Sequence, residues 1–252
     1  MPGRDPGGIV ERFRLARRDQ RLAVLEGFHP LKHALRFGAH VEEVICSDAA
    51  ALAGLVGRLA PDTADAIERL APEPVSGELF AAAAPRPPSP VLAIARRPDP
   101  PLPYAPDAPL VVLDRPTHHG NVGAVVRVAA AAGAGGVFVL EGVDPWHPAA
   151  LRGGAGLQFA LAAESGDAVR LGGLCEGRAR VAVIPGAPPA AEPLPPGAAL
   201  LFGAERAGLG PELERSARRV VGIPMRPGVS SLNLATAVAV VLYGEISPRF
   251  VR

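Results

Sequence analysis

A proline-rich segment near the middle of the sequence most strongly limits what this chain can fold into. Residues 96–109, RRPDPPLPYAPDAP, contain six prolines. Because proline lacks a backbone N–H and has a fixed φ, this segment cannot continue a helix or a central strand. We therefore expect an extended, exposed linker over residues 98–108, with one domain at residues 1–97 and a second at residues 109–252.

The residues before the linker alternate between strand-like and helix-like patterns. We predict these segments in chain order: a strand at 23–27, a helix at 28–39, a strand at 41–47, a helix at 48–60, a short helix near 77–84 and a strand at 89–97. Such alternation predicts a small α/β domain in which helices cover a sheet. Six arginines within residues 4–21 form a weak basic arm, which a solvated helix face explains about as well.

The residues after the linker contain longer apolar segments that alternate with a helical pattern. We predict the following elements: strands at 109–116, 136–142, 179–185 and 198–204, and helices at 122–132 and 234–243. Strands that are apolar on both faces and alternate with helices are typical of a mostly parallel sheet. The fold class predicted for the chain is therefore α/β.

Composition excludes several classes of protein. The formal net charge is only +1, so no field of the whole protein favours nucleic acid. The two cysteines, Cys46 and Cys175, lie far apart and have no neighbouring Cys or His at metal-ligand spacing. We therefore expect a reduced, cytoplasmic protein without a disulfide or a bound metal. The N-terminal residues lack the apolar segment of a signal peptide, so we expect no membrane association.

Three loops of the second domain are expected at the carboxyl ends of strands, where open α/β sheets bind their ligands. In the first loop, Asn121 and Gly123 lie at the start of a predicted helix and Arg127 lies one turn beyond Gly123. An asparagine cap and a solvated arginine explain this spacing better than a binding site does. Two adjacent histidines, His118 and His119, are expected to be exposed turn residues.

The second loop, LLFGAERAGLG at residues 200–210, leads from an apolar strand into Gly203 and Glu205. It lacks the GK[ST] of a phosphate-binding P-loop and the GxGxxG of a dinucleotide site. Two interpretations remain open. Glu205 caps a short helix, or the main chain of the loop lies against a ligand while Glu205 fixes the loop by hydrogen bonds.

The third loop, IPMRPGVSSLNLATAVAVVLYGE at residues 223–245, places polar side chains before an apolar helix. Ser230, Ser231 and Asn233 suit a helix cap, and they also suit a ligand site. Taken alone, each of the three loops is ambiguous.

Together, NVGAVVR, LLFGAERAGLG and IPMRPGVSSLNLATAVAVVLYGE closely resemble the three motifs of the SpoU (TrmH-like) branch of the SPOUT RNA methyltransferases, in the same order. DPWHP at residues 144–148 resembles a further segment of this family, and LEGFHPLKHALRFGAHVEEVICSD resembles its N-terminal domain. The resemblance implies an S-adenosylmethionine-dependent enzyme that methylates a ribose 2′-hydroxyl of ribosomal or transfer RNA. It also implies a homodimer, a C-terminal domain with a trefoil knot, and an RNA-binding N-terminal domain of ribosomal-protein-like fold.

The resemblance also assigns roles to residues of the three loops. By position, Gly203, Ile223 and Leu232 match residues whose backbones hold the cofactor. The side chains that match the polar active-site set are Asn121, Arg127, Glu205, Ser231 and Asn233.

Arginine stays protonated in nearly all proteins, so either the RNA makes Arg127 a transient base or Arg127 only positions phosphate and ribose. We favour positioning or shared activation. Ser231 and Asn233 would then orient the hydroxyl, and Glu205 would brace the site. Two other functions stay open: a methyltransferase that protects ribosomal RNA from an antibiotic, and an RNA-binding or ribosome-assembly module with little catalysis.

Overall fold

The chain folds into two compact units in the computed structural model, which describes residues 6–84, 87–205 and 207–250, with only the backbone described at 6, 7 and 245–250. The first unit contains the residues up to Pro101 together with Trp146–Ala160, and the second contains Leu102–Pro145 and the residues from Leu161 on. The sequence had placed residues 146–160 in the second domain, whereas here they pack with the first. Among the described helices, none is long and apolar enough to cross a membrane.

The first unit is built on a four-stranded sheet with the strand order β1-β4-β2-β3. Its strands are β1 (Leu22–Glu26), β2 (Val41–Cys46), β3 (Glu73–Pro74) and β4 (Val91–Arg96). Its helices are α1 (Pro6–Ala16), α2 (Phe28–Arg36), α3 (Ala49–Leu59), the short 3₁₀ helix η1 (Pro61–Thr63), α4 (Ala64–Arg69), α5 (Gly77–Ala83), α7 (Pro148–Gly153) and the 3₁₀ helix η2 (Leu157–Phe159). β4 lies antiparallel between β1 and β2, while β3 pairs in parallel with β2.

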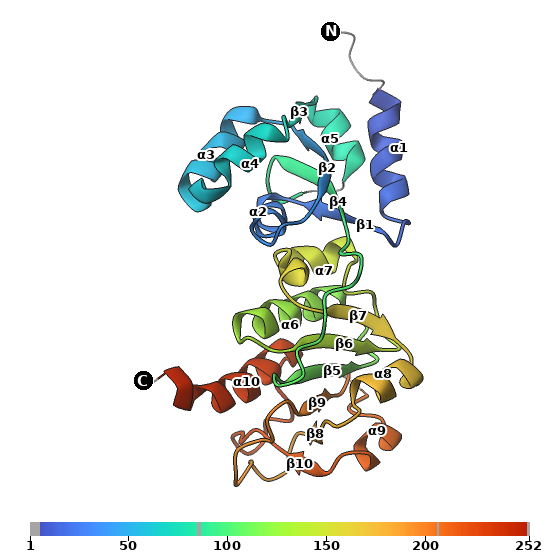
Figure 1. The fold of residues 1–252 in the computed structure, drawn as a ribbon, viewed down its shortest axis with the longest axis vertical. Helices are drawn as coiled ribbons and strands as arrows, with labels where there is room; N and C mark the ends of the chain where they lie inside the picture. The colour runs from blue at the N-terminus through green and yellow to red at the C-terminus, as the bar shows by residue number, and fades with distance from the viewer. Residues whose placement is uncertain (1–5, 85–86, 206, 251–252) are drawn as a thin grey trace. The chain divides into compact units, whose positions relative to one another are not determined.

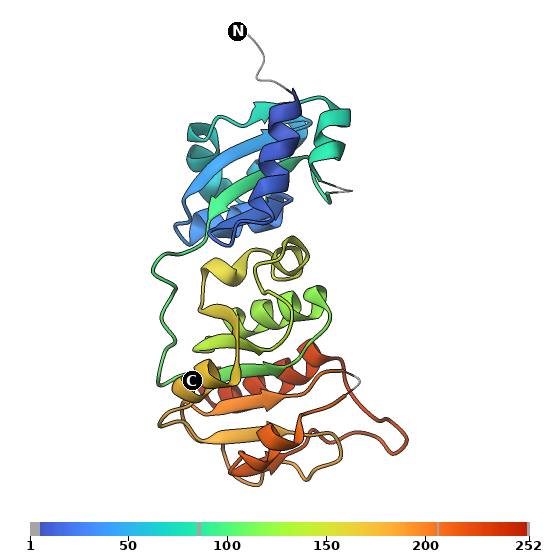
Figure 2. The same cartoon turned by 90° about the vertical axis from the view of Figure 1, so that its right-hand side faces the viewer.

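Helices cover both faces of this sheet (Figures 1 and 2). On one face, Ile9 and Phe13 of α1 pack with Phe80 of α5 against the sheet. The opposite face carries α2, α3 and α4, together with side chains of the 146–160 segment. α1 falls within the predicted basic arm, and its buried residues recur at helical spacing, so this segment is an integral part of the core.

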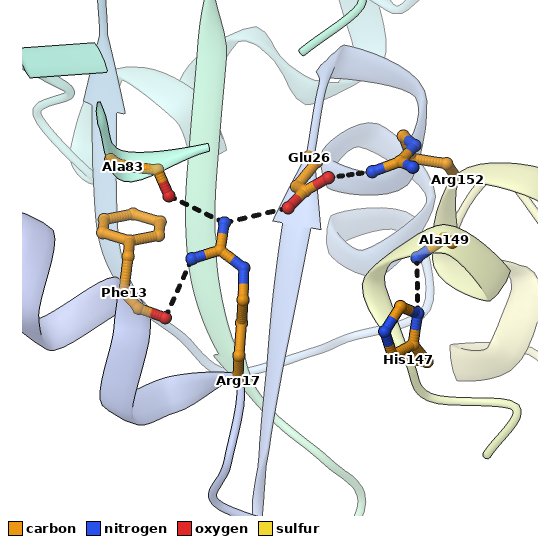
Figure 3. Close-up of polar contacts among 7 residues, drawn as sticks. All are labelled: Phe13, Arg17, Glu26, Ala83, His147, Ala149 and Arg152. Atoms are coloured by element: carbon orange, nitrogen blue, oxygen red, sulfur yellow. Dashed lines mark hydrogen bonds and ion pairs between the residues drawn. The ribbon is translucent and has the colours of Figure 1, made fainter. Parts of the chain in front are cut away.

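The 146–160 segment is joined to the first unit by packing and by a buried carboxylate. Trp146 and Phe159 meet edge to face, with ring centroids 5.0 Å apart, inside the core. At the end of β1, the Glu26 carboxylate is almost fully buried between Arg17 and Arg152 of α7 (Figure 3). The Arg17 guanidinium also donates to the carbonyls of Phe13 and Ala83. One carboxylate therefore connects α1, β1 and α7.

The second unit contains a six-stranded sheet in which every pair of neighbouring strands is parallel, with the order β10-β8-β9-β5-β6-β7. Its strands are β5 (Leu110–Asp114), β6 (Gly136–Leu140), β7 (Ala163–Gly166), β8 (Arg180–Val183), β9 (Ala199–Phe202) and β10 (Arg219–Val221). Its helices are α6 (His119–Ala131), α8 (Ala168–Leu174), α9 (Pro211–Arg215) and α10 (Leu234–Phe250). The prediction of an α/β fold with a mostly parallel sheet is confirmed.

This sheet is buried on both faces, as its continuous apolar strands predict. In β5, Val111 and Leu113 face α6 and α10, whereas Leu110 and Val112 face α8. In Figure 1, α6 and α10 lie on one side of the strands and α8 and α9 on the other. The second unit is thus a three-layer α/β/α structure.

The proline-rich linker is not exposed along its whole length, because its second half docks on the second unit. The Tyr104 ring occupies the space that a Cβ would need at Gly136, and its hydroxyl donates to the carbonyl of Val137 at 3.4 Å. The Arg178 guanidinium donates to the carbonyls of Ala105 and Ala108. Residues 105–107 are exposed, as predicted, whereas Tyr104 and Ala108 are half-buried. The carbonyls that the linker cannot pair within a helix or sheet accept hydrogen bonds from Arg178, which holds this half of the linker against the second unit.

Candidate active site

The three loops singled out in the sequence meet at one edge of the second sheet. β5 and β9 are neighbours in the sheet, and β8 and β10 follow β9 toward the sheet edge. Because the strands are parallel, their carboxyl ends lie on the same side and their loops converge there. The loop after β5 leads into α6, the loop after β9 leads into α9, and the loop after β10 leads into α10.

A pocket of about 480 Å³ lies among the loops after β8, β9 and β10. Its apolar wall includes Val183, Phe202 and Leu234. All three predicted cofactor residues, Gly203, Ile223 and Leu232, line it, and so do Glu205 and Ser231 of the predicted polar set. A pocket of this size, with mostly apolar walls and a few polar groups, is typical of a site for a small molecule or cofactor.

A hydrogen-bonded chain of side chains connects all three loops. The Asn121 amide donates from Nδ2 to Oε1 of Glu205. Asn233 donates from Nδ2 to Oδ1 of Asn121 at 3.4 Å. The structure thus brings together three of the predicted polar residues, although 84 residues separate Asn121 from Glu205 and 112 separate it from Asn233.

Asn121 and Asn233 differ in what else they do. The Oδ1 atom of Asn233 accepts from the backbone N–H groups of Ala235, at 3.0 Å, and Thr236, so Asn233 also caps α10. Asn121, by contrast, lies two residues inside α6, which begins at His119. The interpretation of Asn121 as a helix cap is therefore wrong, since its side-chain amide donates a hydrogen bond to Glu205 and does not cap the helix backbone.

Arg127 and Ser231 both present exposed polar groups. Arg127 is exposed on α6, about 9 Å along the helix axis from Asn121 at the rise of an α-helix, and does not line the pocket. In the part of the chain that the structure describes, neither side chain makes a hydrogen bond or an ion pair. The guanidinium of Arg127 and the hydroxyl of Ser231 are therefore available to a ligand.

The glycine at residue 203 is required by the shape of its own loop. A Cβ there would lie 2.1 Å from the carbonyl carbon of Gly208 and 2.2 Å from the nitrogen of Leu209. Ala204 and Gly208 exchange two backbone hydrogen bonds, at 3.2 and 2.9 Å, which fold the loop back on itself. Only a residue without a side chain allows this tight turn at the end of β9, so the loop is preformed at the pocket.

Asp114 supports the same loop, a role that the sequence did not reveal. This carboxylate is buried at the end of β5, accepts from the backbone N–H of Gly210 at 2.7 Å, and is hydrogen-bonded by Arg115. It therefore fixes the start of α9 beside the pocket. A charged residue closing a fully apolar strand was the available signal, because a buried carboxylate needs specific partners.

The described residues contain no group of three or more His, Cys, Asp or Glu side chains that could hold a metal ion. His118 is exposed immediately before α6, and His119 is half-buried as the first residue of that helix. His119 is therefore less exposed than a turn residue was expected to be.

Comparison with known proteins identifies the family. The model of the SpoU rRNA Methylase family matches residues 108–243, which include the first two loops and the third as far as Tyr243 and amount to more than half of the sequence. The chain belongs to the SpoU rRNA methylase family. The predicted resemblance to this family is confirmed.

Individual relatives agree with this assignment. A 23S rRNA (uridine(2479)-2′-O)-methyltransferase from Streptomyces viridochromogenes is 31% identical over 158 residues, which are 55% of this chain and 52% of the relative. The chain spans about half the length of the curated relatives it matches.

Two solved structures share the fold over nearly the whole chain. A structure described as an RNA 2′-O ribose methyltransferase is 28% identical with a TM-score of 0.78, and the match covers 97% of this chain and 96% of that one. The SpoU methyltransferase AviRb from S. viridochromogenes, in complex with the cofactor AdoMet, is 23% identical with a TM-score of 0.77, covering 95% and 98%.

Proposed function

We propose that this SpoU-family chain is an S-adenosylmethionine-dependent methyltransferase that acts on a ribose 2′-hydroxyl of ribosomal RNA. The observation that carries the proposal is the preformed pocket bordered by the Glu205–Asn121–Asn233 chain of hydrogen bonds. The relative named as a 23S rRNA 2′-O-methyltransferase and the AviRb structure with AdoMet support the same activity and cofactor.

The lining of the pocket suits S-adenosylmethionine in its apolar surface and its charge. Its apolar wall, formed in part by Val183, Phe202 and Leu234, suits an adenine ring. In the described lining there is no Lys, Arg or His, while two carboxylates are present, which suits a ligand that carries a positive charge. Backbone groups at Gly203, Ile223 and Leu232 would hold the cofactor.

When bound, the cofactor supplies an activated methyl group, so the protein must mainly align the attacking oxygen and exclude water. Ser231 lies at the pocket with a free hydroxyl, and Asn233 is fixed at the start of α10. We propose that these two side chains orient the 2′-hydroxyl. Arg127 would bind the neighbouring phosphate, because a guanidinium retains its charge and suits bidentate contact with phosphate.

The hydrogen bond from Asn121 gives Glu205 a bracing role, since it joins the loop after β9 to α6. Loss of either side chain would allow the loop after β9 and the start of α6 to move independently. Positioning of this kind contributes strongly to rate, because displacement of a reacting group by about 1 Å costs on the order of 100-fold.

The wider organisation of the protein is part of the same proposal. Residues 1–97 would bind RNA through a ribosomal-protein-like fold, residues 98–108 would act as the linker, and residues 109–252 would carry the knotted catalytic domain. We further propose a homodimer that acts in the cytoplasm. Recognition would depend on RNA shape and on unstacked nucleotides, as is usual for RNA.

Two experiments test this function. Titration calorimetry should show S-adenosylmethionine binding to the full chain, and absence of binding would remove the proposal. Mapping of 2′-O-methylation in total RNA with and without the gene should show the loss of one ribosomal RNA site. Loss of a transfer RNA site would correct the substrate, and binding without any lost site would favour an RNA-binding or assembly role. Altered antibiotic sensitivity together with a lost site would favour the resistance function.

A further inference from the structure

The pocket has an uneven distribution of charge. Glu205 and Glu214 are the two ionisable side chains in its described lining, and both are acidic. The other lining residues are apolar, glycine or serine, such as Ile184, Met225 and Ser230. A site with this lining has a negative potential and favours a cationic ligand over a neutral one of the same shape.

The two carboxylates are not equivalent. Glu205 already accepts a hydrogen bond from the Asn121 amide. For the carboxylate of Glu214, the described residues provide no hydrogen bond and no ion pair. Glu214 is therefore the acidic group whose charge is available to a ligand in the pocket.

Glu214 is also held in place by its backbone. It lies in α9, and its N–H donates to the carbonyl of Gly210 at 2.9 Å. Gly210 is in turn fixed by the buried carboxylate of Asp114. Although the Glu214 side chain is exposed, its backbone thus has a fixed position relative to the pocket.

We infer that Glu214 is a specificity-determining residue that makes the pocket prefer the methyl donor over the demethylated product. This inference rests on the proposed function. In the transfer, the ribose oxygen forms a bond to the methyl carbon while the carbon–sulfur bond breaks. The bond pair stays on sulfur, which becomes a neutral thioether, and the hydroxyl proton is released. S-adenosylmethionine therefore carries one more positive charge than S-adenosylhomocysteine, and the unpaired carboxylate distinguishes the two.

The size of the effect follows from exposure. An ion pair formed by a solvent-exposed group contributes little and is weakened by salt, whereas a partly desolvated pair contributes more. Because Glu214 is exposed but lines a pocket, we expect its charge to change the affinity for a cationic ligand by roughly three- to tenfold.

The test compares ligands of different charge on the full chain by titration calorimetry. S-adenosylmethionine and sinefungin both carry the additional positive charge, and S-adenosylhomocysteine lacks it. In Glu214→Gln, the dissociation constants of the two cationic ligands should rise by roughly three- to tenfold, while that of S-adenosylhomocysteine changes less than about twofold. Glu214→Lys should bind the neutral product more tightly than the donor.

Kinetics and a matched control separate this role from a structural one. At saturating donor, Glu214→Gln should keep the kcat of the unchanged protein while its KM for S-adenosylmethionine rises. Glu212→Gln changes an exposed acid of the same helix that does not line the pocket, and it should leave all three affinities unchanged.

Two results would overturn the inference. One is an equal loss of affinity for all three ligands in Glu214→Gln. This result would indicate that the substitution damages the pocket, or that Glu214 contacts a group that all three ligands share. The other is no change for any ligand. If the unaltered chain binds none of the three, the proposed function itself fails, which is a distinct outcome.

Discussion

Replacement of Glu26 by glutamine tests how the first unit is held together. Glu26 is only 2% exposed. Its carboxylate forms ion pairs with Arg17, the residue that follows α1, and with Arg152 of α7. Glutamine keeps the shape of the side chain but removes its charge and one acceptor oxygen. Both arginine contacts are therefore weakened without creating a cavity.

The magnitude follows from the exposure of the partners. A hydrogen bond to a charged group contributes about 1.5–3 kcal/mol. The side chains of Arg17 and Arg152 are 26% and 40% exposed, so water compensates part of this loss. We expect Glu26→Gln to lower the free energy of unfolding of the first unit by about 2–3 kcal/mol.

Replacement of the two arginines should lower the free energy of unfolding by different amounts. Arg152→Ala leaves Glu26 paired with Arg17 and should cost about 1 kcal/mol. Arg17→Ala also leaves the carbonyls of Phe13 and Ala83 without their guanidinium donor, so we expect about 3–4 kcal/mol.

The sequence provides a reporter for this unit, because its only tryptophan, Trp146, is buried in the core of the first unit. Tryptophan fluorescence during urea denaturation therefore follows the unit that contains Glu26. Arg96→Ala removes a more exposed ion pair, with Glu42, and should change stability by less than about 0.5 kcal/mol. If Glu26→Gln has no larger effect than this control, the reasoning about the buried carboxylate is wrong.

Four further predictions concern the second unit and the cysteines. Arg127→Ala should lower methyl transfer at least about 100-fold while S-adenosylmethionine affinity, measured by calorimetry, stays within about twofold; normal turnover would show that its role was misassigned. Asp114→Ala removes the acceptor that fixes the α9 loop and should weaken cofactor binding by roughly tenfold, with Asp114→Asn closer to the original. Gly203→Ala should destabilise the chain by about 1–3 kcal/mol in thermal or urea unfolding, because its Cβ meets loop backbone. Burial raises the pKa of the Cys46 and Cys175 thiols, so a thiol reagent at pH 8 should label them only after denaturation, and rapid labelling of the folded chain would contradict their burial.

Most strands and the helices α2, α3, α6 and α10 could be predicted from local patterns, whereas the segment of α1 was interpreted as a basic arm or a solvated helix face. β5 and β6, for example, were visible as continuous apolar segments, and such segments are typical of a sheet covered on both faces. Strands with few apolar residues were not predicted, because they lack such a continuous apolar segment. β7 has the sequence AESG and β10 only three residues, so neither contains enough apolar residues to show a period.

The candidate site was only partly visible in the sequence. The motif residues could be identified because their order and spacing resemble one family. Asp114 and Glu214 lie outside the polar set of those motifs, and only the loop geometry shows that one supports α9 and the other lines the pocket. The packing of residues 146–160 with the first unit was likewise not visible in the sequence, since the apolar side chains of this segment do not specify which core they enter.

The sequence by itself determined the alternation of strands and helices, the parallel sheet and the three polar loops, because these depend on side-chain period and on residues close along the chain. Only the tertiary structure decided that Asn121, Glu205 and Asn233 form one hydrogen-bonded chain and that Trp146–Ala160 completes the first unit. The physical reason is that such contacts depend on strand order and on the burial of distant surfaces, and no local pattern encodes either of them.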